Sequence, residues 1–259
     1  SDLKKPEAAF PLDLLFCGTC SLVQLGYAVD PDLLFRDRDY VYNTGSNNTL
    51  KANLKELVEK ILTKYSLKSG DFVIDVGSND GTLLSNYLPH GIKVLGIDPS
   101  SATSLAKNIG VETLVDYFNE ASAQKVLATN GKASAITATN VFAHVVELDS
   151  FMRGVYLLLA DKGVFVSESG YVVDMVEGMQ YDSIYHEHLR YYSVRSLIAL
   201  FEKYGMEIVS IEKIQSHGGS IRVFAAKKGA YTPDSSVAEL LALEKQKGYH
   251  EQGVYKEFA

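Results

Sequence analysis

Short apolar runs alternate with amphipathic stretches along most of the chain. Five runs have the length and the Val, Ile and Leu content of buried strands, at residues 72–76, 93–98, 111–115, 134–139 and 163–168. Apolar residues recur at helical spacing over residues 50–65, 81–88, 101–109 and 194–204. Strands that alternate with helices predict an α/β fold, with a mainly parallel sheet and helices on both of its faces.

Two further strands are expected near the end of the chain, at residues 206–214 and 220–227. They are joined by a short connection through residues 217–219, so they should pair in antiparallel fashion. A mainly parallel sheet with an antiparallel final strand is typical of the Rossmann-like class I methyltransferases.

The pattern divides the chain into three parts. Residues 1–49 hold short apolar segments around a Cys-x-x-Cys turn, followed by a polar stretch. Residues 50–230 carry the alternating strands and helices, and residues 231–259 are charged and helical. Because the chain starts at Ser1 and stops without a capping signal, we expect a fragment in which residues 231–259 begin a further C-terminal domain.

Composition narrows the class of protein. Of 259 residues, 46% are apolar, which is enough for a sizeable core. The net charge of −7 and the absence of a basic run argue against a nucleic-acid partner. There is also no apolar run long enough to span a membrane and no signal-peptide pattern, so a cytoplasmic protein is expected.

A glycine-containing loop follows the first strand of the large domain. Its spacing, Asp75-x-Gly77-x-x-x-Gly81, differs from the Gly-x-Gly-x-x-Gly of dinucleotide-binding proteins. This spacing is typical of proteins that bind S-adenosylmethionine. The glycines let the backbone approach the ligand closely. We expect cofactor contacts from Asp75, Gly77, Ser78, Asn79 and Gly81; a plain strand-to-helix turn is the alternative.

Two polar residues at later strand ends extend this predicted site. Asp98 ends the second strand about 20 residues after the loop, where an acidic side chain can accept hydrogen bonds from both ribose hydroxyls. Asn140 follows the fourth strand, where methyltransferases place a residue near the sulfonium. A turn-capping role for Asn140 is equally open.

The segment of residues 182–189 concentrates ionisable and aromatic side chains, with Tyr185, His186, Glu187 and His188 in succession. Histidine titrates near neutral pH, so general base chemistry is the favoured interpretation. A zinc site built on His186 and His188 and a purely structural cluster of histidines are the alternatives.

Four stretches, at residues 15–25, 76–83, 184–189 and 217–222, together resemble the deoxysugar C-methyltransferases of the dTDP-sugar C-3 type. They occur in the family's order over nearly the whole chain, and the Tyr-His-Glu-His segment is the most specific of them. The resemblance implies S-adenosylmethionine as methyl donor and a nucleotide-linked 4-keto-deoxysugar as substrate.

The resemblance also implies roles for particular residues. His188 would be the base that removes a proton from the carbon beside the ketone, with Tyr185 and Glu187 next to it. His144 would polarise the keto oxygen or hold the substrate. The substrate-binding residues it suggests are Tyr40, Tyr42, His186, Ser220 and Arg222, although the turn before Ser220 can equally be a plain hairpin.

Cys17 and Cys20 look like half of a structural zinc site. Relatives in the family carry two Cys-x-x-Cys pairs, and structural zinc needs four ligands. This chain has two cysteines in all, so the other two ligands would lie upstream of Ser1. A redox role is the rival interpretation of the pair.

The resulting hypothesis is an S-adenosylmethionine-dependent C-methyltransferase that acts through a base-generated enolate. A methyltransferase with an oxygen or nitrogen acceptor is not separated from it by these motifs. A Rossmann-type dehydrogenase or epimerase is disfavoured by the loop spacing. A non-catalytic cofactor-binding module is disfavoured by the intact Tyr185, Glu187 and His188.

Overall fold

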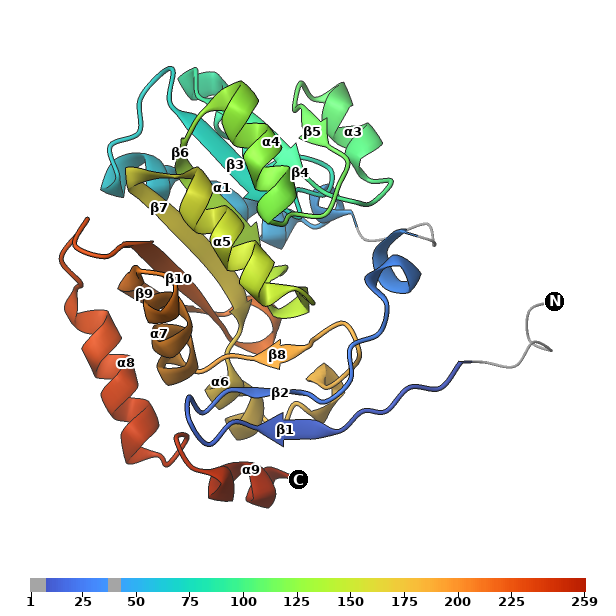
Figure 1. Ribbon diagram of the computed structural model, residues 1–259, viewed down its shortest axis with the longest axis vertical. Helices are drawn as coiled ribbons and strands as arrows, with labels where there is room; N and C mark the ends of the chain where they lie inside the picture. Colours follow the sequence, from blue (N-terminus) through green and yellow to red (C-terminus); the bar gives the residue numbers. More distant parts are fainter. Residues whose placement is uncertain (1–7, 37–42) are drawn as a thin grey trace.

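A seven-stranded sheet forms the centre of the protein, whose computed structural model describes residues 8–36 and 43–259 (Figure 1). The strand order is β5-β4-β3-β6-β7-β10-β9. In that order the strands are β5 (Thr113–Leu114), β4 (Lys93–Ile97), β3 (Phe72–Val76), β6 (Ala133–Thr139), β7 (Leu159–Gly170), β10 (Ser220–Lys227) and β9 (Met206–Ile214).

The direction of the strands matches the expectation from sequence. The neighbours from β5 to β7 pair in parallel, whereas β10 is antiparallel to both β7 and β9. The antiparallel strand therefore lies second from the edge of the sheet. The predicted α/β fold, with a methyltransferase-type sheet that contains an antiparallel final strand, is confirmed.

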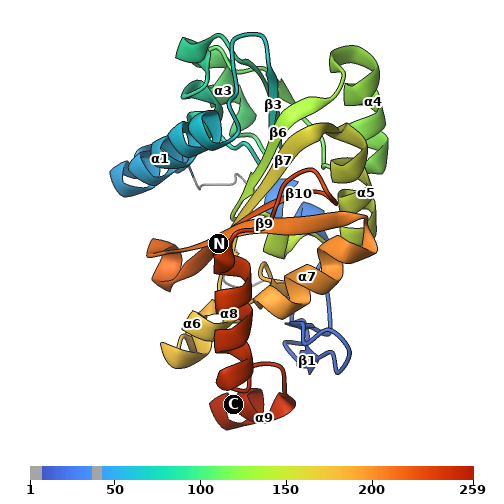
Figure 2. The same ribbon diagram turned by 90° about the vertical axis from the view of Figure 1, so that its left-hand side faces the viewer.

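Helices cover both faces of the sheet (Figure 2). Ile74 and Val76 pack in a cluster with residues of α4 (Glu120–Asn130), α5 (Leu148–Leu158) and α7 (Val194–Lys203). Val73 packs on the other face with α1 (Asn48–Lys64), α2 (Thr82–Ser85) and α3 (Thr103–Asn108). Alternate side chains of a strand point to opposite faces, so a strand that is apolar throughout needs helices on both sides.

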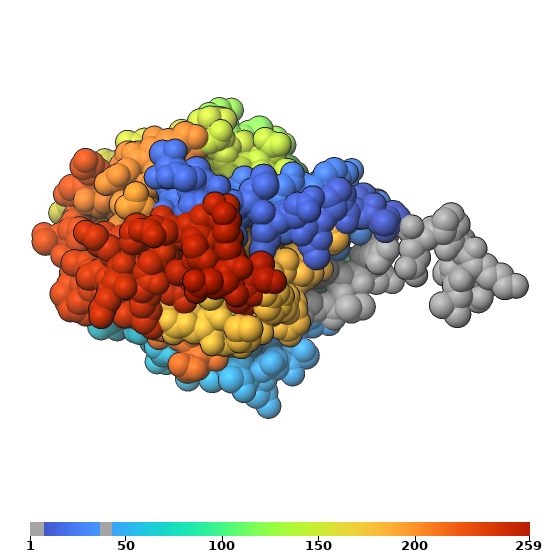
Figure 3. Space-filling view, turned by 90° about the horizontal axis from the view of Figure 1, so that it is seen from below, coloured from blue at the N-terminus to red at the C-terminus, as the bar shows by residue number. Residues whose placement is uncertain are grey.

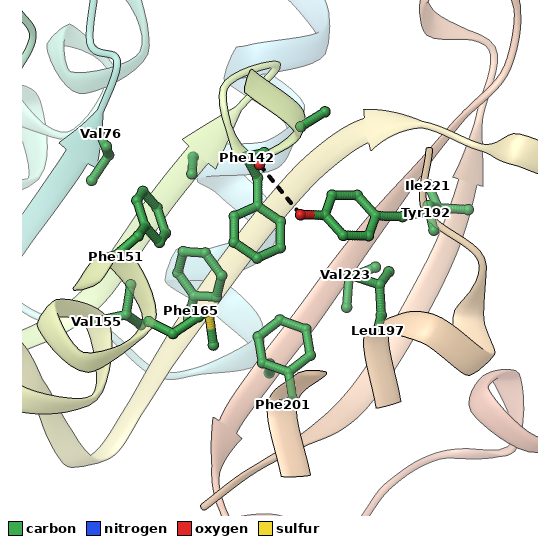
Figure 4. Packing of buried hydrophobic residues seen from close by; sticks show 14 of the residues in the cluster. Val76, Phe142, Phe151, Val155, Phe165, Tyr192, Leu197, Phe201, Ile221 and Val223 are labelled. Carbon is green, nitrogen blue, oxygen red and sulfur yellow. Dashed lines mark hydrogen bonds between the residues drawn. The ribbon is translucent and has the colours of Figure 1, made fainter. Parts of the chain in front are cut away.

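An aromatic cluster fixes the loop that follows β6 (Figure 4). Phe142 stacks on Tyr192 at 5.2 Å and lies against Phe151, Phe165 and Phe201. The Tyr192 hydroxyl donates a hydrogen bond of 3.4 Å to the Phe142 carbonyl. Because Phe142 is fully buried, the residues on either side of it are held in place above the sheet.

The helix predicted over residues 81–88 is shorter than expected. α2 ends at Ser85, and a 3₁₀ turn follows over Leu88–His90. The Asn86 side chain donates to the Thr82 and Leu83 carbonyls, and Pro89 has no N–H with which to continue the helix.

A smaller antiparallel sheet, β1-β2-β8, lies beside the large one (Figure 1). It joins β1 (Leu14–Phe16) and β2 (Val23–Leu25), the expected strands around the cysteine turn, to β8 (Arg190–Tyr191). β2 thus pairs with β8, which begins two residues after His188. The predicted division into residues 1–49, 50–230 and 231–259 stays a prediction.

The C-terminal helices lie on the same face as the N-terminal strands (Figure 3). These helices are α8 (Ser235–Gln246) and α9 (Gln252–Phe258). Tyr255 of α9 contacts the ring of Phe16 at 5.4 Å, and the Ser21 hydroxyl donates to the His250 carbonyl. In the described ranges 8–36 and 43–259, no helix has the length and apolar character that a membrane span requires.

A buried carboxylate from α8 holds the start of α7. Glu244 is 2% exposed and accepts hydrogen bonds from the backbone N–H groups of Val194 and Arg195 and from the Tyr171 hydroxyl. The first N–H groups of a helix have no partner within the helix, and they attract negative charge. The C-terminal segment is therefore bound to the large domain by a polar network as well as by apolar contacts.

Replacement of Glu244 by alanine should lower the free energy of unfolding by about 3 kcal/mol, because buried donors lose their acceptor. Glu239→Ala, on an exposed position of the same helix, is the matched control and should cost less than about 1 kcal/mol. Urea unfolding of the purified variants measures both values. Equal values for the two variants would contradict the assigned role of Glu244.

Candidate active site

One cavity of about 880 Å³ opens at the carboxyl ends of β3, β4, β6 and β7. Its wall includes the ends of these strands and the segment of residues 183–191. Parallel α/β sheets bind ligands at this edge. The predicted cofactor residues and the predicted catalytic residues therefore line a single space, although they are far apart in the sequence.

The loop after β3 approaches the loop after β6 so closely that only glycine fits. Gly77 has a φ of 68°, and a Cβ placed there would lie 2.2 Å from Cγ2 of Val141. Asn140, on the other side of the contact, has a φ of 55° and donates its N–H to the Glu168 carbonyl at 2.8 Å. Both residues line the cavity, as the sequence predicted.

Asp98 is buried at the end of β4 and organises the same loop. One carboxylate oxygen accepts from the Asn79 backbone N–H at 2.9 Å, and the other accepts from the backbone N–H of Ser100 at 2.8 Å and from its hydroxyl. A carboxylate offers about four lone-pair sites, so acceptor capacity remains on the cavity side. This arrangement fits a pair of ribose hydroxyls.

Two further groups in the cavity wall favour a polar ligand. The Ser78 hydroxyl is buried and has no hydrogen-bond partner in the described part of the chain. Asp75 accepts from the Thr137 hydroxyl at 2.6 Å, and burial raises the pKa of its carboxyl to about 7. The tight glycine approach, the unpartnered hydroxyl and Asp98 together fit an adenosyl cofactor.

Gly81 lies outside the cavity lining. Its φ is 78°, and a Cβ there would come within 3.0 Å of Ala106 and 3.1 Å of Val111. Gly81 therefore lets α2 pack closely on α3. It affects the cofactor site indirectly, because this packing sets the position of the loop after β3.

The sequence did not reveal that residues 43–46 contact this loop. The Thr44 N–H donates to the Asn79 side chain at 3.1 Å, and the Gly45 N–H donates to Asp80 at 2.7 Å. Thr44 itself lines the cavity. The predicted substrate residues Tyr40 and Tyr42 lie outside the described residues.

His188 is oriented by hydrogen bonds at both ring nitrogens. Its Nδ1 lies 2.9 Å from the Ser183 carbonyl and its Nε2 lies 3.1 Å from the Tyr185 hydroxyl. A carbonyl only accepts, so Nδ1 carries the proton and Nε2 presents a lone pair. Burial lowers the pKa of His188, which keeps the ring neutral and able to accept a proton.

His144 lies beside His188, with ring centroids 5.1 Å apart. Burial, and then the charge of His188, lowers the pKa of His144 to about 3. His144 is consequently a neutral hydrogen-bonding group at physiological pH.

Tyr185 and Glu187 also line the cavity. Burial, and then the charge of Glu187, raises the pKa of Tyr185, while burial raises the pKa of Glu187. The phenol therefore remains protonated and able to donate. All four predicted catalytic residues, Tyr185, Glu187, His188 and His144, are brought together by the fold.

His186 is directed away from this group and does not line the cavity. Its Nε2 lies 3.3 Å from the Phe10 carbonyl and 3.2 Å from the Pro11 carbonyl, and its ring meets Phe10 edge-on. These contacts attach the N-terminal segment to the segment of residues 183–188. This placement disagrees with the predicted substrate contact of His186. It also disagrees with a metal ion bound by His186 and His188 together.

Ser220 and Arg222 likewise lie outside the cavity lining, and both are fully buried. The Arg222 guanidinium donates from Nε to Glu168 at 3.1 Å and from one terminal nitrogen to Asn53 at 2.9 Å. Burial of a charge requires such a partner. Arg222 therefore forms an internal ion pair. This placement disagrees with the substrate contact that the sequence predicted for it.

Cys17 and Cys20 are free thiols in the turn between β1 and β2. In residues 8–36 and 43–259, no group of three or more His, Cys, Asp or Glu side chains could hold a metal ion. The described residues therefore do not complete a four-ligand zinc site, and no chemical step is assigned to a metal.

The cavity also contains residues that sequence analysis did not select as site residues. They include the aromatic residues Phe118, Phe151 and Tyr171, together with Arg190 and His217. Aromatic residues in apolar surroundings carry no distinguishing pattern in the sequence. For His217, the signal in the sequence that could have identified it was the Gly218-Gly219 pair that follows it.

The strand order and the cavity at the carboxyl edge define a class I methyltransferase fold. Solved structures agree: magnesium protoporphyrin IX methyltransferase from Synechocystis, with bound SAM, is 14% identical and has a TM-score of 0.55, over 78% of this chain and 99% of that chain. An S-adenosylmethionine-dependent methyltransferase from Clostridium acetobutylicum is 13% identical with a TM-score of 0.54, over 69% and 92%.

Family models match along the chain. A methyltransferase domain matches residues 47–211, a C-methyltransferase C-terminal domain matches residues 215–259, and a proposed zinc binding domain matches residues 1–35. The chain is 35% identical over 255 residues to C-methyltransferase NovU of Streptomyces niveus, and it spans about 60% of that relative's length. The chain belongs to the family defined by this methyltransferase domain.

Replacement of Arg222 by alanine should lower the free energy of unfolding by about 3–5 kcal/mol, because Glu168 is left as an unpaired buried charge. Arg153→Ala removes an exposed ion pair with Glu120 and should cost less than about 1 kcal/mol. Chemical unfolding measures both values. A stable Arg222 variant with weakened substrate binding would restore the substrate-contact interpretation.

Replacement of Asp98 by asparagine should weaken the binding of S-adenosylhomocysteine about tenfold or more, because charge-assisted hydrogen bonds are lost. Calorimetric titration measures the change. Asp161→Asn is the control, since this side chain is exposed at the opposite end of β7. Unchanged affinity in the Asp98 variant would remove the ribose assignment.

Proposed function

We propose that this protein is an S-adenosylmethionine-dependent C-methyltransferase whose substrate is a nucleotide-linked 4-keto-deoxysugar. The observation that carries the proposal is the geometry of His188, a neutral imidazole whose Nε2 lone pair faces the Tyr185 hydroxyl, in the same cavity as the glycine loop. A base next to a methyl-donor site is what carbon methylation requires, because a sugar carbon is not nucleophilic until it loses a proton.

His188 removes the proton from the carbon adjacent to the ketone. The C–H bond breaks, its electrons form the enolate, and the proton moves to Nε2. The Ser183 carbonyl, already hydrogen-bonded to Nδ1, stabilises the imidazolium that forms. The lowered pKa of His188 keeps the lone pair available in the resting state.

The enolate oxygen requires hydrogen-bond donors that are in place before the charge develops. Tyr185 remains protonated, and its hydroxyl reaches the catalytic nitrogen of His188. When the substrate takes that position, the hydroxyl is free to donate to the keto oxygen. His144 supplies a second neutral donor beside it.

S-adenosylmethionine supplies an electrophilic methyl group on its sulfonium sulfur. The chain's own contribution is to hold the enolate carbon in line with that group. Gly77, Asp98 and Asn140 fix one side of the cavity, and the segment of residues 183–188 fixes the other. Apolar walls such as Phe118 and Phe151 exclude water, which would otherwise compete for the methyl group.

The nucleotide-linked sugar as substrate is supported by the four stretches that resemble the deoxysugar C-methyltransferases and by the similarity to C-methyltransferase NovU. A cavity of about 880 Å³ is large enough for the adenosyl cofactor together with a hexose. The polar groups of His144, Glu187 and His188 suit a substrate rich in oxygen atoms.

Replacement of His188 by asparagine should reduce methyl transfer about 100-fold or more while leaving S-adenosylhomocysteine affinity nearly unchanged. The same variant should lose exchange of the proton next to the ketone when a dTDP-linked 4-keto-6-deoxyhexose is incubated in D₂O with enzyme and S-adenosylhomocysteine. NMR follows the exchange. His90→Asn, an exposed histidine outside the cavity, is the matched control.

Equal loss of cofactor binding and turnover in the His188 variant would show that the histidine is structural. Treatment of the methylated product with hot hydriodic acid separates carbon from oxygen acceptors, because this reagent cleaves a methyl ether and leaves a C-methyl group in place. Release of the methyl group as methyl iodide would replace the proposed function by O-methylation.

A further inference from the structure

The turn that connects β9 to β10 has an unfavourable backbone at a histidine. His217 has φ 50° and ψ 42°, a left-handed conformation that side chains with a Cβ rarely adopt. Gly218 and Gly219 follow with φ values of 80° and 120°. Glycine at position 217 would adopt this conformation without strain, so the histidine calls for a reason other than the turn itself.

Surrounding residues hold this turn firmly. The Gln180 side chain donates to the Gly218 carbonyl at 2.7 Å, and the Ser220 hydroxyl donates to the Ser216 carbonyl at 3.0 Å. A Cβ at Gly219 would lie 2.7 Å from Asp174. The turn is thus fastened to the chain leading to Ser183 and His188.

The imidazole of His217 faces the cavity that contains His188. Its Nδ1 lies 2.7 Å from the Ser216 hydroxyl, whereas Nε2 has no hydrogen-bond partner in the part of the chain that the structure describes. Because the Ser216 hydroxyl can either donate to Nδ1 or accept from it, Nε2 can serve a ligand as a donor or as an acceptor.

We propose that His217 is a further substrate-binding residue, whose Nε2 forms a hydrogen bond with a hydroxyl group of the sugar. The assignment rests on the proposed function for the identity of the substrate. It explains why a strained histidine occupies a position suited to glycine. It also gives the sugar a contact from the β9–β10 turn, on an element separate from the segment that carries His188.

The test uses two variants that keep the turn. His217→Gly removes both the strain and the imidazole, and His217→Asn places a residue that tolerates left-handed backbone. Both should unfold at a temperature equal to or above that of the unaltered protein and bind S-adenosylhomocysteine equally well. His90→Asn serves as the control for loss of an exposed histidine.

With a dTDP-linked 4-keto-6-deoxyhexose, both His217 variants should lose about tenfold in kcat/KM and in calorimetric affinity for the sugar nucleotide, measured in the presence of S-adenosylhomocysteine. Unchanged values in stable variants would overturn the proposal. If the unaltered protein neither methylates the sugar nor exchanges its proton, the proposed function fails, whereas the comparison of sugar affinities still decides the role of His217.

Discussion

The buried ion pair between Arg222 and Glu168 connects the sheet to the cofactor site. Its side chains join β10 to β7 and, through Asn53, to α1. The backbone carbonyl of Glu168 accepts the N–H of Asn140, the residue before Val141, which meets the glycine loop at Gly77. An antiparallel strand inserted beside β7 therefore supplies the charge that allows Glu168 to be buried where the cavity begins. Both the fold and the cofactor site depend on this ion pair. The buried carboxylate of Glu168 needs the guanidinium of Arg222 as its partner, and the loop that begins at Asn140 needs the end of β7.

Desolvation determines which ionisable groups in the cavity are neutral, and it therefore sets their different roles. Burial works against charge, so it lowers the pKa of the histidines and raises that of the phenol and the carboxyl groups. Burial alone does not say which ring nitrogen of His188 carries the lone pair. The Ser183 carbonyl shows that it is Nε2, because the carbonyl can only accept a hydrogen bond and so Nδ1 must carry the proton. In the proposed mechanism the site consequently holds a base and neutral donors side by side, which a water-exposed cluster of the same residues would not maintain at one pH.

The sequence predicted the sheet well because buried strands and glycine turns leave local patterns. It predicted Gly77, Asp98 and Asn140 for the same reason, since each follows a recognisable strand end. It was wrong about the length of the helix after Gly81, where Asn86 and Pro89 act together. It also placed His186 in the site beside His188, because an irregular segment has no periodicity to say which side chain faces inward. Arg222 looked like a substrate residue since its partner Glu168 is 54 residues away and leaves no local signal.

The segment that carries His188 has little regular structure of its own, so its precision depends on distant parts of the chain. His186 attaches it to the N-terminal residues Phe10 and Pro11, and Gln180 attaches it to the β9–β10 turn. Tyr181 stacks on Phe258 of α9 at 4.3 Å. Figure 3 shows the terminal segments that supply these contacts lying together on one face. A catalytic group must be held within a fraction of an ångström, and three attachments from separate elements do this without a helix or strand beneath it. The terminal segments are thus part of the active site's construction, even though no predicted catalytic residue belongs to them.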